Sequence, residues 1–113
     1  MKKILLTLLL ITLPLFGGTR MCDKGEVIKL LKDDLRGIKH QKFIIKIHSG
    51  LTLLVAHNID LAPRIDTLQK GDQIKFCGEF ETNSKGGVIH WTHHDPRGKH
   101  QGGWIEHKNK RYE

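Results

Sequence analysis

Residues 41–57 read QKFIIKIHSGLTLLVAH, and the fold follows from this stretch. Its first half places Phe43, Ile45 and Ile47 on one face and mostly polar side chains on the other, which is the pattern of a half-buried antiparallel strand. Its second half, residues 51–57, is apolar on both faces, as in a central strand. Ser49-Gly50 favours a tight turn between the halves. The stretch therefore predicts a β-hairpin at the centre of an all-β domain.

The flanking segments carry further strand patterns. We expect strands over residues 25–31, 73–81 and 88–94, the last ended by Asp95-Pro96 because proline has no N–H for a sheet ladder. Pro63 restricts the connection over residues 58–68 to a short helical or irregular path. Residues 103–112, with a turn at Lys108-Asn109, predict a C-terminal hairpin. This order predicts a small five-stranded OB-like barrel, with another small barrel or a sandwich as the alternative.

The N-terminus predicts export. Lys2 and Lys3 precede the apolar run ILLTLLLITLPLF and the small pair Gly17-Gly18, the organisation of a secretory signal peptide over residues 1–18. The run is too short to predict a stable membrane span. Cys22 raises lipidation as an alternative, which Arg20 in the preceding residues disfavours. We therefore expect one domain over residues 19–113 in the periplasm or outside the cell.

Charge and cysteine content favour an anionic partner and a disulfide. The formal charge of +7 falls to +5 when Lys2 and Lys3 are removed with the signal. Such a balance attracts nucleic acid, anionic glycans or membrane surfaces. The only two cysteines, Cys22 and Cys77, predict one disulfide in an oxidising compartment.

Residues 85–104, KGGVIHWTHHDPRGKHQGGW, hold four of the eight histidines and both tryptophans, a density that indicates a site. Histidine titrates near neutrality and can act as acid, base or metal ligand. The candidate catalytic residues are His57, Arg64, His90, His94 and Asp95. The candidate ligand-binding residues are His40, Lys42, Lys46, His93, Arg97 and Trp104. For Arg64, a clamp on Asp60 or Asp66 is the structural alternative.

Four runs of the chain also resemble the signatures of one family. They are RGIKHQKF at 36–43, LLVAHNIDLAPR at 53–64, GGVIHWTHHDP at 86–96 and GWI at 103–105. These runs are similar to those of the small exported bacterial family catalogued as domain of unknown function 3465. The resemblance spans nearly the whole exported part and implies a family without an established activity.

Three functions remain open from the residues. The first is binding of a polyanion, nucleic acid before others, at a histidine-rich polar face, with phosphodiester hydrolysis as its extension. The second is a zinc or copper site formed by His57, His90 and His94. The third is an envelope interaction module without catalysis. Whether the protein is an enzyme is left open at this point.

Overall fold

The computed structural model describes residues 18–113, so the predicted signal segment, apart from Gly18, lies outside the described residues. Residues 18–113 contain no helix. They form seven strands: β1 (Thr19–Leu30), β2 (His40–Ile47), β3 (Thr52–Asn58), β4 (Gln73–Glu81), β5 (Val88–His90), β6 (Trp104–His107) and β7 (Lys110–Tyr112). The expectation of an all-β chain is confirmed, and none of the described residues belongs to a helix that could cross a membrane.

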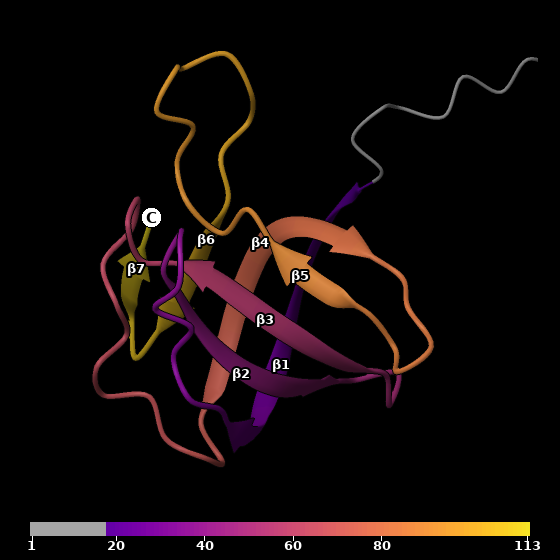
Figure 1. The fold of residues 1–113 in the computed structure, drawn as a ribbon. Coiled ribbons are helices and arrows are strands. Elements are labelled where there is room, and N and C mark those ends of the chain that lie inside the picture. Colours follow the sequence, from indigo (N-terminus) through magenta and orange to yellow (C-terminus); the bar gives the residue numbers. More distant parts are fainter. Residues whose placement is uncertain (1–17) are drawn as a thin grey trace, which may run out of the picture.

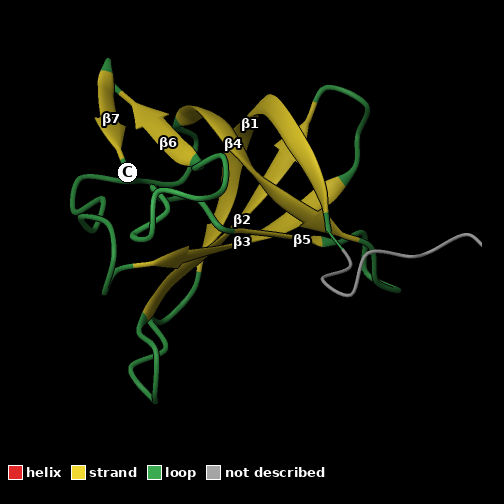
Figure 2. Ribbon diagram, turned by 90° about the horizontal axis from the view of Figure 1, so that it is seen from above, coloured by secondary structure: helices red, strands yellow, loops and turns green. Residues whose placement is uncertain are grey.

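Five of the strands close into a barrel. The sheet runs β1-β2-β3-β5-β4, and β1 pairs with β4 to close it. All these pairs are antiparallel except β3 with β5, which is parallel. This is the strand order of an OB-like barrel, as predicted (Figure 1). The β6–β7 hairpin extends the sheet at β4 on one side of the barrel (Figure 2).

β1 closes the barrel because it is long enough to pair with two strands, β2 and β4. Its first half, from Thr19 to Glu26, pairs with β4, and its second half, from Gly25 to Leu30, pairs with β2. The expected start at Gly25 was wrong by six residues. The missed part, TRMCDK, is largely exposed, so it lacks the alternation that marks a half-buried strand.

The barrel interior is filled by alternate residues of the strands. Phe43 and Ile45 of β2, Leu53 of β3, Phe76 of β4 and Ile89 of β5 are all fully buried. The alternation of residues 41–48 therefore predicted the correct inward face. β3 is apolar on both sides because it is central, with Leu54 and Ala56 half-buried outside.

The connection between β3 and β4 is irregular. It runs over residues 59–72 without a helix and places Ala62, Ile65 and Leu68 in buried positions. The two alternatives offered by Pro63 are thus resolved in favour of the irregular path. This segment packs apolar side chains against the barrel core and is held there by polar contacts described below.

β5 is much shorter than expected. The predicted strand over residues 88–94 ends at His90, because Trp91 takes a positive φ of 57° and turns the chain out of the sheet. The loop then returns to β6 through Gly103, which approaches the Trp91 and Cys77 carbonyl oxygens too closely for a side chain. A strand continuing to residue 94 would put His90, Thr92 and His94 on one face, because side chains alternate along a strand, and the turn at Trp91 prevents this.

Two local predictions are confirmed. Cys22 and Cys77 stand directly opposite each other on β1 and β4 and form a disulfide. Such a bond is compatible with an oxidising extracellular compartment. Lys108 and Asn109 both have positive φ, at 49° and 64°, as the two-residue hairpin turn between β6 and β7 requires.

Candidate functional site

His57 lies in the interior of the molecule and not on a solvent-exposed surface. It is the penultimate residue of β3, on the inward side, and is fully buried. Its Nε2–H donates to the Pro63 carbonyl oxygen at 2.9 Å, since that oxygen can only accept. Its Nδ1 is then free to accept from the Thr92 hydroxyl at 2.7 Å. Burial lowers the pKa of His57, so the ring is neutral at pH 7 and both nitrogens are occupied.

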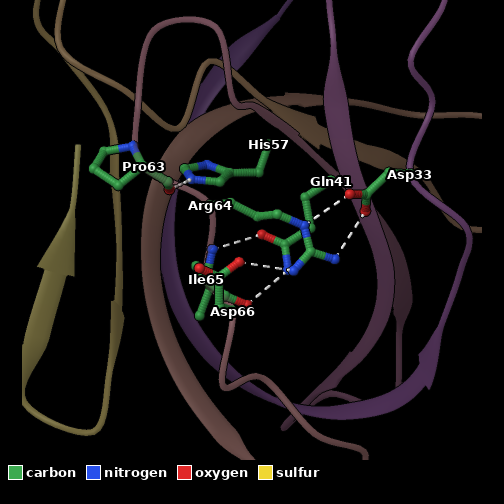
Figure 3. A network of polar contacts seen from close by, with 7 residues as sticks. All are labelled: Asp33, Gln41, His57, Pro63, Arg64, Ile65 and Asp66. Carbon is green, nitrogen blue, oxygen red and sulfur yellow. Dashed lines mark hydrogen bonds and ion pairs between the residues drawn. The ribbon is translucent and has the colours of Figure 1, made fainter.

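Arg64 clamps two loops together (Figure 3). Its Nε and Nη2 donate to the two oxygens of Asp33, at 2.7 and 3.1 Å, and its Nη1 donates to Asp66 at 3.0 Å. These bonds to Asp33 first, and to Asp66 next, raise the pKa of Arg64. Of the two clamp partners considered from the sequence, Asp66 is present, while Asp60 instead accepts from the Lys39 backbone N–H.

Gln41 completes this network and was missed by sequence reasoning. Its amide pairs with the backbone of Ile65, donating to the carbonyl oxygen and accepting from the N–H, both at 2.9 Å. Gln41 is buried on the inward face of β2. A polar residue at an inward position of an alternating strand was the available signal. Together with His57 and Arg64, Gln41 fixes the 59–72 connection across the end of the barrel (Figure 3).

The histidine-rich stretch divides into separate environments. His93 is buried, stacks against Trp91 at a ring-centroid distance of 4.7 Å, and donates from Nδ1 to the His94 carbonyl oxygen. His94 is exposed, and His40 lies half-buried at the start of β2. These three histidines therefore differ in their exposure to solvent and do not form a single polar face.

His90 stands on the outer face of the barrel beside two carboxylates. It is directly opposite Glu79 of β4, and its Nε2 lies 3.9 Å from Glu79 Oε2 and 3.5 Å from Glu81 Oε1. That nitrogen is buried and makes no hydrogen bond to any described residue. The ring is about one third exposed. This is the part of the predicted site in which a titratable ring and carboxylates meet.

Asp95 organises the loop between β5 and β6. Its carboxylate accepts the backbone N–H groups of Arg97, Lys99 and His100 at 3.1, 2.9 and 2.7 Å. These bonds, His100's first, lower the pKa of Asp95. Arg97, Lys99 and His100 are all exposed on the loop, which projects from the barrel in Figure 1.

The three residues considered for zinc or copper do not converge. His57 is enclosed, His90 lies on the outer barrel face and His94 is exposed on the following loop. Within residues 18–113, no group of three or more His, Cys, Asp or Glu side chains is placed to hold a metal ion.

A basic surface crosses the outer face of β2, β1 and β4. Lys24, Lys46 and His48 line one shallow hollow together with Gln73 and one carboxylate, Glu26, which stands opposite Lys46. Lys24 stands directly opposite Lys75, and Lys75 stands opposite Glu106 on its other side. Glu106 pairs with Arg111, and none of the three lysines has a carboxylate within 4.0 Å in the described chain. We call these three lysines and one histidine the basic track: Lys24, Lys46, His48 and Lys75. Lys46 was predicted, whereas Lys24 lies in the part of β1 that the sequence pattern missed.

Trp104 extends the basic track along β6. A second hollow, sharing Lys24 and Lys75 with the track, is lined by Trp104, the disulfide cysteines and the carboxylate-bearing Asp23. The guanidinium of Arg111 lies over the Trp104 ring, 4.0 Å from its centroid. Lys42, the remaining predicted lysine, is half-buried on β2 opposite Ala56 and lies outside both hollows. An aromatic ring and at least two free ammonium groups thus share one surface.

Comparison with known protein families gives a match to this chain. The family model described as protein of unknown function, DUF3465, matches residues 17–113. The chain belongs to the DUF3465 family. No curated protein and no solved structure matches it. The DUF3465 match covers the whole described fold, including the internal network and the basic track.

Proposed function

We propose that this DUF3465 protein binds a polyanion, nucleic acid first, along the basic track and Trp104. The observation that carries the proposal is the Lys24–Lys75 pair. Like charges directly opposite in a sheet repel and destabilise it. Glu106 stands opposite Lys75 on the other side, in β6, but it pairs with Arg111 at 3.7 Å and lies beyond 4.0 Å from the Lys75 ammonium. A ligand with phosphate groups relieves that repulsion. Trp104 beside the pair offers a base-stacking surface, which single strands use.

We expect the protein to bind this ligand outside the cytoplasm. The predicted signal and the Cys22–Cys77 disulfide both support an exported protein, periplasmic or secreted. The nucleic acid would then be extracellular or incoming DNA. The charge of +5 expected for the exported part supports long-range attraction of such a ligand.

The test is binding of a fluorescent single-stranded oligonucleotide by residues 19–113 over a salt series. The variant Lys24→Gln/Lys75→Gln should bind about tenfold more weakly, and its salt slope should fall by about 1.4, or 0.7 for each lost phosphate contact. The matched control is Lys70→Gln/Lys85→Gln, which removes the same charge from exposed loops. Equal affinity of the two double variants would refute the assignment of the track, and binding that does not respond to salt would refute phosphate contacts altogether.

Hydrolysis of the bound strand is the second candidate, favoured by His90. Glu79 and Glu81 lie on the same outer face of β4 as Lys75, so His90 is reachable from the track. An imidazole beside carboxylates can act as a general base toward water. Loss of nuclease activity in His90→Ala with unchanged oligonucleotide affinity would support this step. Full activity in that variant would exclude His90 from it.

A further inference from the structure

The loop between β1 and β2 exposes large apolar side chains. Leu35 and Ile38 are 61% and 60% exposed, more than any other large hydrophobic residue in the described chain. They belong to residues 35–39, LRGIK, which we call the β1–β2 tip. In Figure 1 the tip lies on the purple trace that joins the two strands. Single exposed aliphatic residues are ordinary, but two on one five-residue tip require a reason.

The tip is held in place. Asp34 and His40 exchange two backbone hydrogen bonds, both 2.9 Å, which close the loop at its base. Within the loop, the Arg36 N–H donates to Asp34 Oδ1, and Gly37 takes the positive φ of 62° that the turn needs. The apolar side chains are therefore presented by a fixed backbone.

Two further contacts tie the tip to the rest of the molecule. Lys39 bonds through its backbone to the Asp60 carboxylate and to the Ile59 N–H. Asp33, just before the base, is held by Arg64. The internal network that fixes the 59–72 connection thus also positions the tip, whose exposure is a property of the folded state.

The charged side chains on the tip itself are cationic, while carboxylates lie at its base. Arg36 is 98% exposed at its side chain, and Lys39 is exposed beside Ile38. Of the three carboxylates at the base, Asp33 pairs with Arg64, whereas Asp34 and Asp60 accept backbone N–H groups of the tip and keep their negative charge. The 3.9 Å contact between Arg36 Nε and Asp34 is exposed and weak. Aliphatic side chains flanked by cations match an anionic lipid surface.

We propose that the β1–β2 tip docks this protein on anionic lipid bilayers. Leu35 and Ile38 enter the interfacial region, while Arg36 and Lys39 contact headgroup phosphates. A lipid surface fits better than a protein partner, because a stable protein interface needs about 800 Å² from each side, far more than two side chains supply. Shallow insertion combined with charge attraction requires no such area.

The tip is separate from the basic track. His40, at the base of the tip, and Lys46 of the track are at opposite ends of β2, six residues or about 20 Å apart along the strand. Vesicle binding and oligonucleotide binding can therefore be disturbed independently.

The experiment is cosedimentation of residues 19–113, which contain all seven strands, with vesicles of phosphatidylglycerol and phosphatidylcholine in equal amounts. Pure phosphatidylcholine vesicles serve as the uncharged comparison. We expect binding to the anionic vesicles, about tenfold weaker in Leu35→Ser/Ile38→Ser. Arg36→Gln/Lys39→Gln should also weaken vesicle binding. Lys24→Gln/Lys75→Gln should keep most of the vesicle binding while binding the oligonucleotide about tenfold more weakly.

Two results would overturn the proposal. One is the absence of wild-type binding to anionic vesicles. The other is equal vesicle binding by wild type and Leu35→Ser/Ile38→Ser, which would reduce the interaction to adsorption by charge. Because both side chains are mostly exposed, these variants should keep the wild-type melting curve. The single changes Leu35→Ser and Ile38→Ser provide the same test if the double variant unfolds.

Discussion

The internal network beneath the 59–72 connection and the outer basic track differ in whether their polar side chains have partners within the protein. In the network, His57, Gln41 and Arg64 have all found protein partners, and His57 and Gln41 are buried. On the track, Lys24 and Lys75 face each other without a carboxylate in ion-pair range among the described residues. Satisfied polar groups stabilise the fold, whereas unsatisfied like charges cost stability and are available to a ligand. The following changes test that contrast.

Removal of His57 should have the largest effect. His57→Ala leaves a cavity and deprives the Thr92 hydroxyl and the Pro63 carbonyl of their partner. We expect a loss of about 3 kcal/mol in the free energy of unfolding, measured by urea denaturation. The exposed His94→Ala is the matched control and should change it by less than about 0.5 kcal/mol. Similar losses in the two variants would contradict the internal role of His57.

Removal of the Gln41 amide should come next. Gln41→Ala leaves the backbone N–H and carbonyl of Ile65 without the partner that each has now. Their desolvation predicts a loss of about 2 kcal/mol in the free energy of unfolding. Hydrogen exchange should show faster exchange at the Ile65 amide than in wild type. An unchanged exchange rate there would mean that Gln41 does not hold the connection.

Acidification should lower the free energy of unfolding by protonating His57. Because burial lowers the pKa of His57 below its ordinary value of 6.5, the folded protein favours the neutral ring. The stability that His57 contributes is complete above pH 6.5 and is lost as the pH falls from 6.5 through the lowered folded pKa. Urea midpoints measured from pH 8 to pH 5 should fall in wild type. In His57→Gln this part of the decline should vanish, and its persistence would assign it to another group.

The smallest expected effect has the opposite sign. Lys24→Thr removes a like-charge pair, so the free energy of unfolding should rise by about 0.3 kcal/mol at low salt, while oligonucleotide affinity falls. Thermal melts at low and high salt measure the gain, which salt should erase. Lys70→Thr, on an exposed loop, is the control. A stability loss specific to Lys24→Thr would show that the pair is not repulsive.

The strands that the sequence predicted well are those with one face in the core. Residues 41–48 alternate because Phe43 and Ile45 fill the barrel while Lys46 meets water. The hairpin turn at Lys108-Asn109 was also predicted from the sequence, because a two-residue turn needs two positive φ values and few residue pairs accept them. The first half of β1 was not, since its pairing with β4 depends on backbone hydrogen bonds rather than on apolar side chains.

The candidate site was predictable in its residue types and not in its arrangement. A strand through residues 88–94 placed His90, Thr92 and His94 together, but the turn at Trp91 sends Thr92 inward to His57 and His94 into solvent. Arg64 was correctly considered as a clamp, yet its main partner, Asp33, is 31 residues away and belongs to another loop. Such pairings appear only after distant loops meet.

The sequence by itself determined an all-β barrel, the inward faces of its central strands, the disulfide and the family resemblance. Alternation, turn chemistry and a lone cysteine pair are local or nearly local signals, so each can be read along the chain. The tertiary structure alone decided that His57 is enclosed and that Lys24 faces Lys75. Those outcomes depend on strand register and barrel closure, which bring together residues as far apart in sequence as Thr19 and Phe80.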